Sequence, residues 1–137
     1  MGILATESEV RLRTQTEDVN ETSTALIDVA IEDANVVASS QLRPEAYAEP
    51  VDDAVVLGET LLACGLVLRS LASRAAVRQN RVRVGGQSAE RGRSFGELMR
   101  AAAAFEAEAW EVLAPYTAVV PGESARAASE SAPVLGR

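Results

Sequence analysis

Apolar residues recur at helical spacing in two segments of this chain. From Thr24 to Gln41 they form a single stripe with the i, i+3/i+4, i+7 period, made of Ile27, Ala30, Ile31, Ala34, Val37 and Ala38. From Phe95 to Leu113 the stripe consists of Phe95, Leu98, Met99, Ala102, Phe105, Ala109, Trp110 and Leu113. One apolar face with polar residues opposite predicts an amphipathic helix in each segment.

A third segment, residues 51–77, is apolar almost all round between residues 55 and 71. As one helix it would be about 40 Å long at 1.5 Å per residue. A helix without a polar face is either the central element of a fold or is covered by a neighbouring subunit. Gly58 and Gly65 lie seven residues apart on one side of it, which allows another helix to approach closely.

Helix starts are marked by two capping-box patterns, in which a Ser or Thr is followed three residues later by Glu. Thr6 with Glu9 predicts a short helix over residues 7–13, and Ser94 with Glu97 opens the helix that Pro115 ends. Residues 14–21 are polar and acidic, which predicts a linker, and residues 42–50 contain two prolines, which predicts a connecting loop.

Two segments do not follow the helical period. The run Arg-Val-Arg-Val that begins at Arg81 alternates polar and apolar residues before Gly85 and Gly86, so a short strand or hairpin is expected there. Residues 117–137 are rich in Ala, Ser, Gly and Pro and are expected to form a flexible or partner-ordered tail. The predicted fold is all-α: a small bundle of about four helices with a basic strand-like insertion, residues 1–116 forming the domain and residues 117–137 an arm.

Composition limits the chemistry of the chain. It has no histidine and a single cysteine, so the usual neutral-pH base, an internal disulfide and a thiolate zinc site are excluded. No phosphate-binding or dinucleotide-binding glycine motif occurs. No catalytic residue, cofactor site or metal site is therefore expected, and we interpret the protein as a non-enzyme. Neither a signal peptide nor an uninterrupted apolar run of 18 residues is present, so no membrane association is expected.

Charge divides the chain into blocks. All thirteen basic residues are arginine, and residues 69–100 hold eight of them against two acids, a net charge of +6. Residues 1–68 carry −10 and residues 101–137 carry −3. The basic belt at residues 69–100 is either a solvated surface, a docking surface for carboxylates or a contact for phosphates. Head-to-tail contact between belt and acidic faces of identical copies would build a ring.

The order of these elements resembles the small head–tail connector (adaptor) proteins of tailed bacteriophages and phage-like gene transfer particles. The resemblance covers about residues 5–116: the run from Thr6, the run from Ala25 to Ala34, the long apolar helix, the glycine-centred loop after Arg81, and the terminal run from Ala109 to Tyr116. The loop departs from the family pattern, since it carries Gly85 and Gly86 with Arg91 and Arg93 where an acid and serines are common.

The resemblance implies a structural virion protein of the neck, made in the cytoplasm of a bacterial host. Such proteins form a ring, usually of twelve subunits, under the portal. They contact the portal and the stopper or tail-terminator protein, and they extend a channel through which genomic DNA passes without specific binding. Exposed acids of the second and third helices would suit the channel lining, because like charge keeps DNA from sticking.

From the basic belt and the tail we predict a protein interface of Arg74, Arg78, Arg81, Arg83, Gly85, Gly86, Arg91, Arg93, Tyr116, Val119, Val120, Val134 and Leu135. The alternative is a small helical nucleic-acid-binding or regulatory protein that uses residues 78–93. Against it stand a net charge of −7 and the lack of an aromatic residue among those arginines.

Overall fold

The computed structural model describes residues 3–16, 22–84 and 94–118, and of residues 79–84 the backbone alone. Within these ranges the chain forms α1 (Glu7–Thr14), α2 (Thr24–Gln41), α3 (Asp53–Val84) and α4 (Phe95–Leu113), with two short 3-10 helices, η1 (Pro44–Tyr47) and η2 (Ala114–Tyr116). The described ranges contain no strand, only an isolated bridge between Leu42 and Thr117. The predicted all-α bundle is confirmed.

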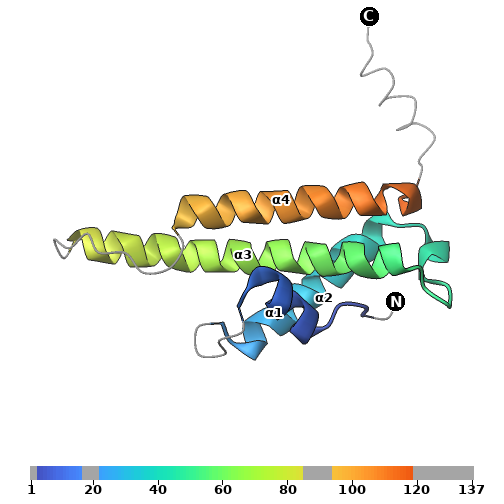
Figure 1. Ribbon diagram of the computed structural model, residues 1–137, viewed down its shortest axis with the longest axis horizontal. Helices are drawn as coiled ribbons and strands as arrows, with labels where there is room; N and C mark the ends of the chain where they lie inside the picture. The colour runs from blue at the N-terminus through green and yellow to red at the C-terminus, as the bar shows by residue number, and fades with distance from the viewer. Residues whose placement is uncertain (1–2, 17–21, 85–93, 119–137) are drawn as a thin grey trace, which may run out of the picture.

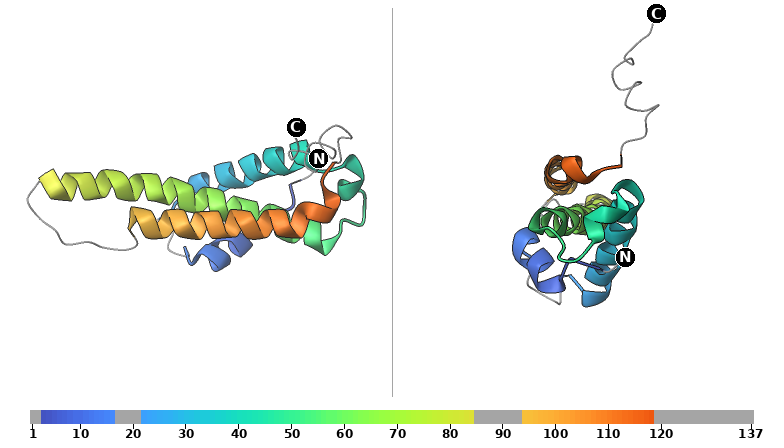
Figure 2. Two further views of the ribbon diagram at one scale, coloured as in Figure 1. Left: turned by 90° about the horizontal axis from the view of Figure 1, so that it is seen from above. Right: turned by 90° about the vertical axis from the view of Figure 1, so that its right-hand side faces the viewer.

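Helix α3 is the axis of the bundle. Helix α4 packs antiparallel along one side of it, and α1 and α2 cover the other side (Figures 1 and 2). At about 1.5 Å per residue α3 is about 48 Å long and α4 about 28 Å long. The C-terminal turns of α3 therefore project beyond the start of α4, as Figure 1 shows.

Side-chain caps fix where the helices begin. The Ser94 hydroxyl accepts a bond from the Glu97 amide at 3.2 Å, and the Glu97 carboxylate accepts one from the Ser94 amide at 3.0 Å, so the predicted capping box is complete. The Thr6 hydroxyl accepts a bond from the Glu9 amide at 3.3 Å. At α3 the Asp52 carboxylate accepts the Ala54 amide at 3.1 Å, so this helix begins two residues later than expected.

The strand predicted at residues 81–84 is wrong, because α3 continues through them to Val84. A four-residue strand needs a partner strand to satisfy its backbone amides. When the same residues lengthen a helix, their amides bond to carbonyl groups within that helix. No proline or glycine interrupts the chain between residue 66 and Gly85, so nothing ends the helix earlier. Gly85 and Gly86 lie outside the described residues.

The core forms around α3, as its apolar sequence predicted. Val55, Leu61, Cys64, Val67 and Leu68 are all fully or almost fully buried. By length and composition the stretch Asp53–Arg78 would also suffice to cross a membrane. The protein itself buries 61% of the window that qualifies, as expected for the central helix of a bundle.

The two α3 glycines permit the close approach of α4. A Cβ atom at Gly58 would overlap the side chain of Leu113, and one at Gly65 would lie 2.8 Å from Glu106 Cγ and 3.3 Å from the Ala102 carbonyl oxygen. Real Cβ atoms essentially never lie closer than 3.0 Å to such a neighbour, and 3.3 Å is tighter than most real Cβ contacts. A larger residue at either position would force Leu113 or Glu106 to shift, so both glycines allow the close packing of α3 against α4, as the sequence indicated.

The predicted stripes of α2 and α4 are buried or half-buried, with two exceptions. Ile27, Ala30, Ile31, Ala34 and Ala38 of α2 lie in the core, as do Leu98, Ala102, Ala109 and Leu113 of α4. Val37 and Phe95 are exposed, however. Phe95 is the first residue of α4.

Candidate interaction surface

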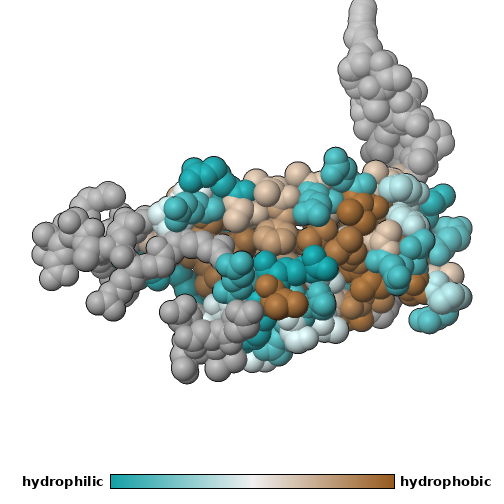
Figure 3. Space-filling view, viewed as in Figure 1, coloured by the Kyte–Doolittle hydropathy of each residue, from teal (hydrophilic) through white to brown (hydrophobic). Residues whose placement is uncertain are grey.

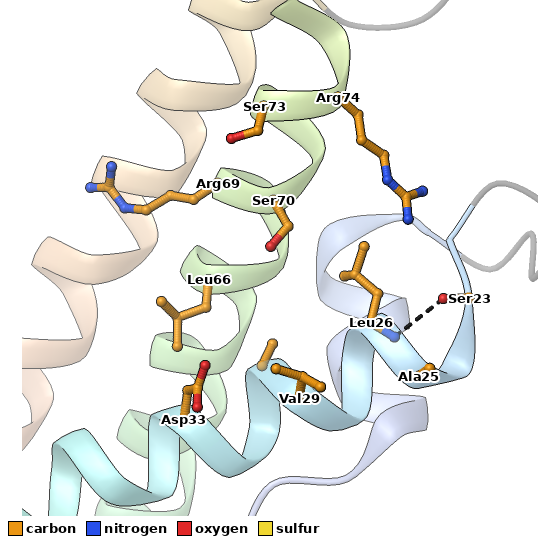
Figure 4. Close-up of a pocket in the computed structure, with 11 residues that line it drawn as sticks. Ser23, Ala25, Leu26, Val29, Asp33, Leu66, Arg69, Ser70, Ser73 and Arg74 are labelled. Atoms are coloured by element: carbon orange, nitrogen blue, oxygen red, sulfur yellow. Dashed lines mark hydrogen bonds between the residues drawn. The ribbon is translucent and has the colours of Figure 1, made fainter. Parts of the chain in front are cut away.

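An open groove of about 590 Å³ lies where α2 and α3 diverge. Leu26 and Val29 of α2 and Leu66 of α3 give it an apolar floor, while Asp33, Arg69 and Arg74 bring charge to its margins (Figure 4). Val29 is 55% exposed, although it sits in a helix whose opposite face is buried. The described part of the protein therefore leaves apolar surface uncovered in this groove.

Local interactions hold the walls of the groove in place. The Ser23 hydroxyl caps α2 by accepting the Leu26 amide at 3.2 Å, drawn as the dashed line in Figure 4. On the α3 side, Arg69 Nε and Nη2 donate to Glu106 Oε2 and Oε1 at 2.5 and 2.6 Å. This paired hydrogen bond to α4 raises the pKa of Arg69, which is fixed by two bonds rather than swinging into the groove.

A second hollow of about 460 Å³ continues from the groove along the projecting end of α3. It shares Ser73 and Arg74 with the groove and adds Val77 and Arg78. Val77 is half-exposed, and Arg78 is exposed beside it. Apolar patches also interrupt the hydrophilic surface on the face of the molecule drawn in Figure 3.

The structure brings together part of the interface predicted from the sequence. Arg74 and Arg78 lie one turn apart on the exposed side of α3. Arg81 and Arg83 belong to the projecting helical end, where the backbone alone is described. The remaining predicted residues of the loop and tail lie outside the described residues: Gly85, Gly86, Arg91, Arg93, Val119, Val120, Val134 and Leu135.

Tyr116, the one aromatic residue of the predicted interface, lies at the end of the bundle opposite to Arg74 and Arg78. Its hydroxyl donates to Asp52 Oδ2 at 2.5 Å, which joins the end of η2 to the start of α3. The hydrogen bond raises the pKa of Tyr116 and lowers the pKa of Asp52. Tyr116 thus has a structural contact within this chain.

The two described residues after Tyr116 also contact the bundle. Thr117 pairs with Leu42 in the isolated bridge, and the Ala118 amide donates to the Gln41 carbonyl at 2.8 Å. The Arg43 amide donates to the Tyr116 carbonyl at 2.9 Å, and its guanidinium donates to the Pro115 carbonyl at 2.8 Å. Residues 41–43, at the end of α2, therefore fix the position of the chain as far as Ala118.

A buried hydrogen-bond cluster around the carboxylate of Glu59 was not predicted from the sequence. Glu59 of α3 is completely buried. Its carboxylate accepts bonds from the Leu4 amide at 3.1 Å, the Tyr47 hydroxyl at 3.1 Å, and the Asn35 side-chain amide at 3.3 and 3.2 Å. Burial, and then the nearby Glu59 charge, raise the pKa of Tyr47. One carboxylate thus ties the N-terminal segment, α2 and η1 to the central helix.

The sequence did carry a signal for this cluster, because Glu59 is the one charged residue in the apolar run of residues 55–68. A lone acid in such a run needs buried donors. The groove had no such signal, since Asp33 and Leu66 meet only through the crossing of α2 and α3. The acids suggested for a channel lining divide: Asp28, Glu32, Asp33, Asp52 and Asp53 are exposed, whereas Glu59 is not.

Among the described residues, no group of three or more Cys, Asp or Glu side chains is arranged to hold a metal ion. Comparison of the chain with protein-family models, curated proteins and solved structures finds no match.

Proposed function

We propose that this protein is a ring-forming connector of a phage-type particle, which binds beneath the portal, joins head to tail and extends the DNA channel. The order of its helices supports this proposal: a short helix, an amphipathic helix, a long central helix and a second amphipathic helix. That is the order on which the resemblance to phage connectors rests.

The observation that carries the proposal is the groove between α2 and α3, which the described residues leave uncovered. Its floor is apolar, its margins carry both signs of charge, and it continues along the projecting end of α3. Exposed apolar surface edged by charge is typical of protein–protein contact sites. A subunit of a closed assembly needs such a surface, because its stability in the particle depends on its neighbours.

The basic end of α3 and the position of Ala118, at opposite ends of the bundle, fit separate contacts with the portal or with neighbouring copies. Arg74 and Arg78, with Arg81 and Arg83 further along α3, place four arginines on one helical end, where they can pair with carboxylates of a partner. Residues 119–137 begin at the opposite end, from the fixed position of Ala118. We assign residues 119–137 as the docking arm that contacts the portal. The stopper or tail terminator would then bind the other face of the ring.

The test is the mass of the purified protein by light scattering, alone and then mixed with the portal protein of the same particle. We expect a stoichiometric complex of high mass that nuclease leaves unchanged. Reversal of charge with Arg81→Glu and Arg83→Glu should weaken the complex while helicity is retained, whereas Arg13→Glu, on the exposed side of α1, should not.

The opposite result is equally defined. Absence of a portal complex, together with salt-sensitive binding of the protein to DNA, would replace the connector by the nucleic-acid-binding alternative. Binding of six or more phosphates would show as a steep fall in DNA affinity with salt.

A further inference from the structure

The groove between α2 and α3 carries opposite charges at its two ends. Asp33 of α2 lies near Leu66 at one end, and Arg74 lies at the other end (Figure 4). Leu66 and Arg74 are eight residues apart on α3, so the charged ends are separated by about 12 Å along the helix. The apolar floor of Leu26 and Val29 lies between them, and Arg69, which also lines the groove, is paired with Glu106 of its own chain.

The outer face of α4 carries the matching pattern. Arg100 and Glu108 are both exposed and are also eight residues apart, about 12 Å along their helix. Between them the exposed positions are alanines: Ala103, Ala104 and Ala107. Methyl side chains let another surface approach closely, so this face offers a narrow apolar strip with a positive and a negative end.

We propose that the groove of one copy binds the outer face of α4 of a neighbouring copy. Arg100 of the neighbour faces Asp33, Glu108 faces Arg74, and the alanine strip covers Val29 and the rest of the apolar floor. Glu111 continues the same register toward Arg78 on the projecting end of α3. Apolar contact supplies affinity and the charges set register and direction.

This contact deepens the proposed ring and rests on it. The groove and the outer face of α4 are different surfaces of the molecule, since α2 and α4 lie on opposite sides of α3 (Figure 2). Each copy therefore uses one surface to bind and the other to be bound. Repetition of such a contact gives a closed ring where the rotation closes, rather than a two-fold dimer.

The decisive experiment mixes two charge-reversed variants of the full chain, Arg74→Glu and Glu108→Arg. Mass is followed by sedimentation over a concentration series at low salt. Each variant alone places like charges across the contact, so we expect half-assembly to need about tenfold more protein than the wild type. An equimolar mixture should recover wild-type assembly, because every contact then joins opposite charges. The control Arg13→Glu should assemble as the wild type does.

If assembly is too weak for sedimentation, a disulfide between copies can trap it. The variant for this test carries Val29→Cys and Ala107→Cys in the same chain. The native Cys64 does not interfere, because burial raises its pKa to about 12. Oxidation should give a ladder of covalent trimers and larger species, while each single substitution stops at dimers. Failure of both the ladder and the complementation would overturn this contact, as would products limited to two copies.

The outcomes separate this contact from the proposed function. A portal complex that forms with both charge-reversed variants, without a ladder, would overturn the contact and leave the connector intact. A ladder with complementation but without a portal complex would support the contact and remove the portal role.

Discussion

At the scale of single residues, the buried Glu59 carboxylate is the most consequential polar group that the structure describes. Its oxygens accept hydrogen bonds from the Leu4 amide, the Asn35 side chain and the Tyr47 hydroxyl. The two carboxylate oxygens satisfy these donors, and the donors in turn replace the water that burial removes.

Glu59→Gln should lower the free energy of unfolding by about 2–3 kcal/mol, because an amide group of nearly the same shape turns its NH₂ toward donors. Urea unfolding measures the change. Glu49→Gln, at an exposed acid of the same region, should leave stability within about 0.5 kcal/mol. Equal stability of the two variants would show that the cluster contributes nothing.

Tyr47 makes the fold sensitive to alkali. Its pKa is raised in the folded chain by burial and by the neighbouring Glu59 charge, from about 10 in the unfolded chain. A raised pKa means that the folded state keeps the proton longer. The stability from this group is therefore complete below pH about 10 and is lost as pH rises through the higher folded value.

Tyr47→Phe should consequently flatten the loss of stability above pH about 10, measured by urea unfolding at a series of pH values. Tyr116→Phe is the variant to compare with Tyr47→Phe. The pKa of Tyr116 is raised chiefly by its hydrogen bond to Asp52, whereas the pKa of Tyr47 is raised chiefly by burial. If Tyr47→Phe loses stability above pH about 10 as the wild type does, another group, such as Cys64, causes the loss.

Gly58 is constrained by its neighbour across the helix interface. Alanine there would gain about 1 kcal/mol of helix propensity, but its Cβ would overlap the fully buried Leu113. Overpacking of this kind costs about 1–3 kcal/mol, so Gly58→Ala should lower the melting temperature. Gly96→Ala is the control, since its Cβ would meet only the mobile end of Arg100 at 3.6 Å. A stabilised Gly58→Ala protein would mean that α4 can move away from α3.

At the scale of elements, the capping box fixes the start of α4. Ser94→Ala removes the bond to the Glu97 amide and should destabilise the protein by about 1 kcal/mol. Faster hydrogen exchange should be confined to the first turn of α4. Ser8→Ala, at an exposed serine inside α1, should change neither quantity.

Helix α3 shows how far pattern alone could predict this fold. Its central place followed from the apolar run, and its close contact with α4 followed from Gly58 and Gly65. The position of its C-terminal end could not be predicted in this way. Residues 81–84 alternate with the period of a strand, but the hydrogen bonds of their backbone are satisfied by continuing the helix. Local pattern reports which face is apolar; it does not report whether a partner strand exists.

The candidate site was less accessible to sequence reasoning than the fold. Arg74 and Arg78 were found from charge density, and they do lie together on α3. The groove beside them depends on how α2 crosses α3, which brings Asp33 near Leu66 although they are far apart in the sequence. Tyr116 was expected at an interface, yet its hydroxyl is bonded to Asp52.

At the scale of the whole molecule, Ala118 is the last residue that the structure describes, and residues 119–137 belong to the predicted arm. Truncation after Ala118 should leave the melting temperature unchanged and reduce portal binding, measured by calorimetry and light scattering. Truncation after Tyr116 also removes the bridge to Leu42 and the bond to Gln41, so it should cost about 1 kcal/mol in addition. Full portal binding by the first truncation would refute a docking role for residues 119–137.

The fixing of the chain exit on α2 also decides how the molecule bears tension. A pull on the C-terminal end is transmitted first through Ala118 to the Gln41 carbonyl and through Thr117 to Leu42. Leu42 is buried in the core, so the load enters the bundle through the end of α2. Helix α4, although it comes directly before the exit in sequence, is relieved of that force until these contacts break. The last turn of α2 is thus the mechanical anchor of the protein.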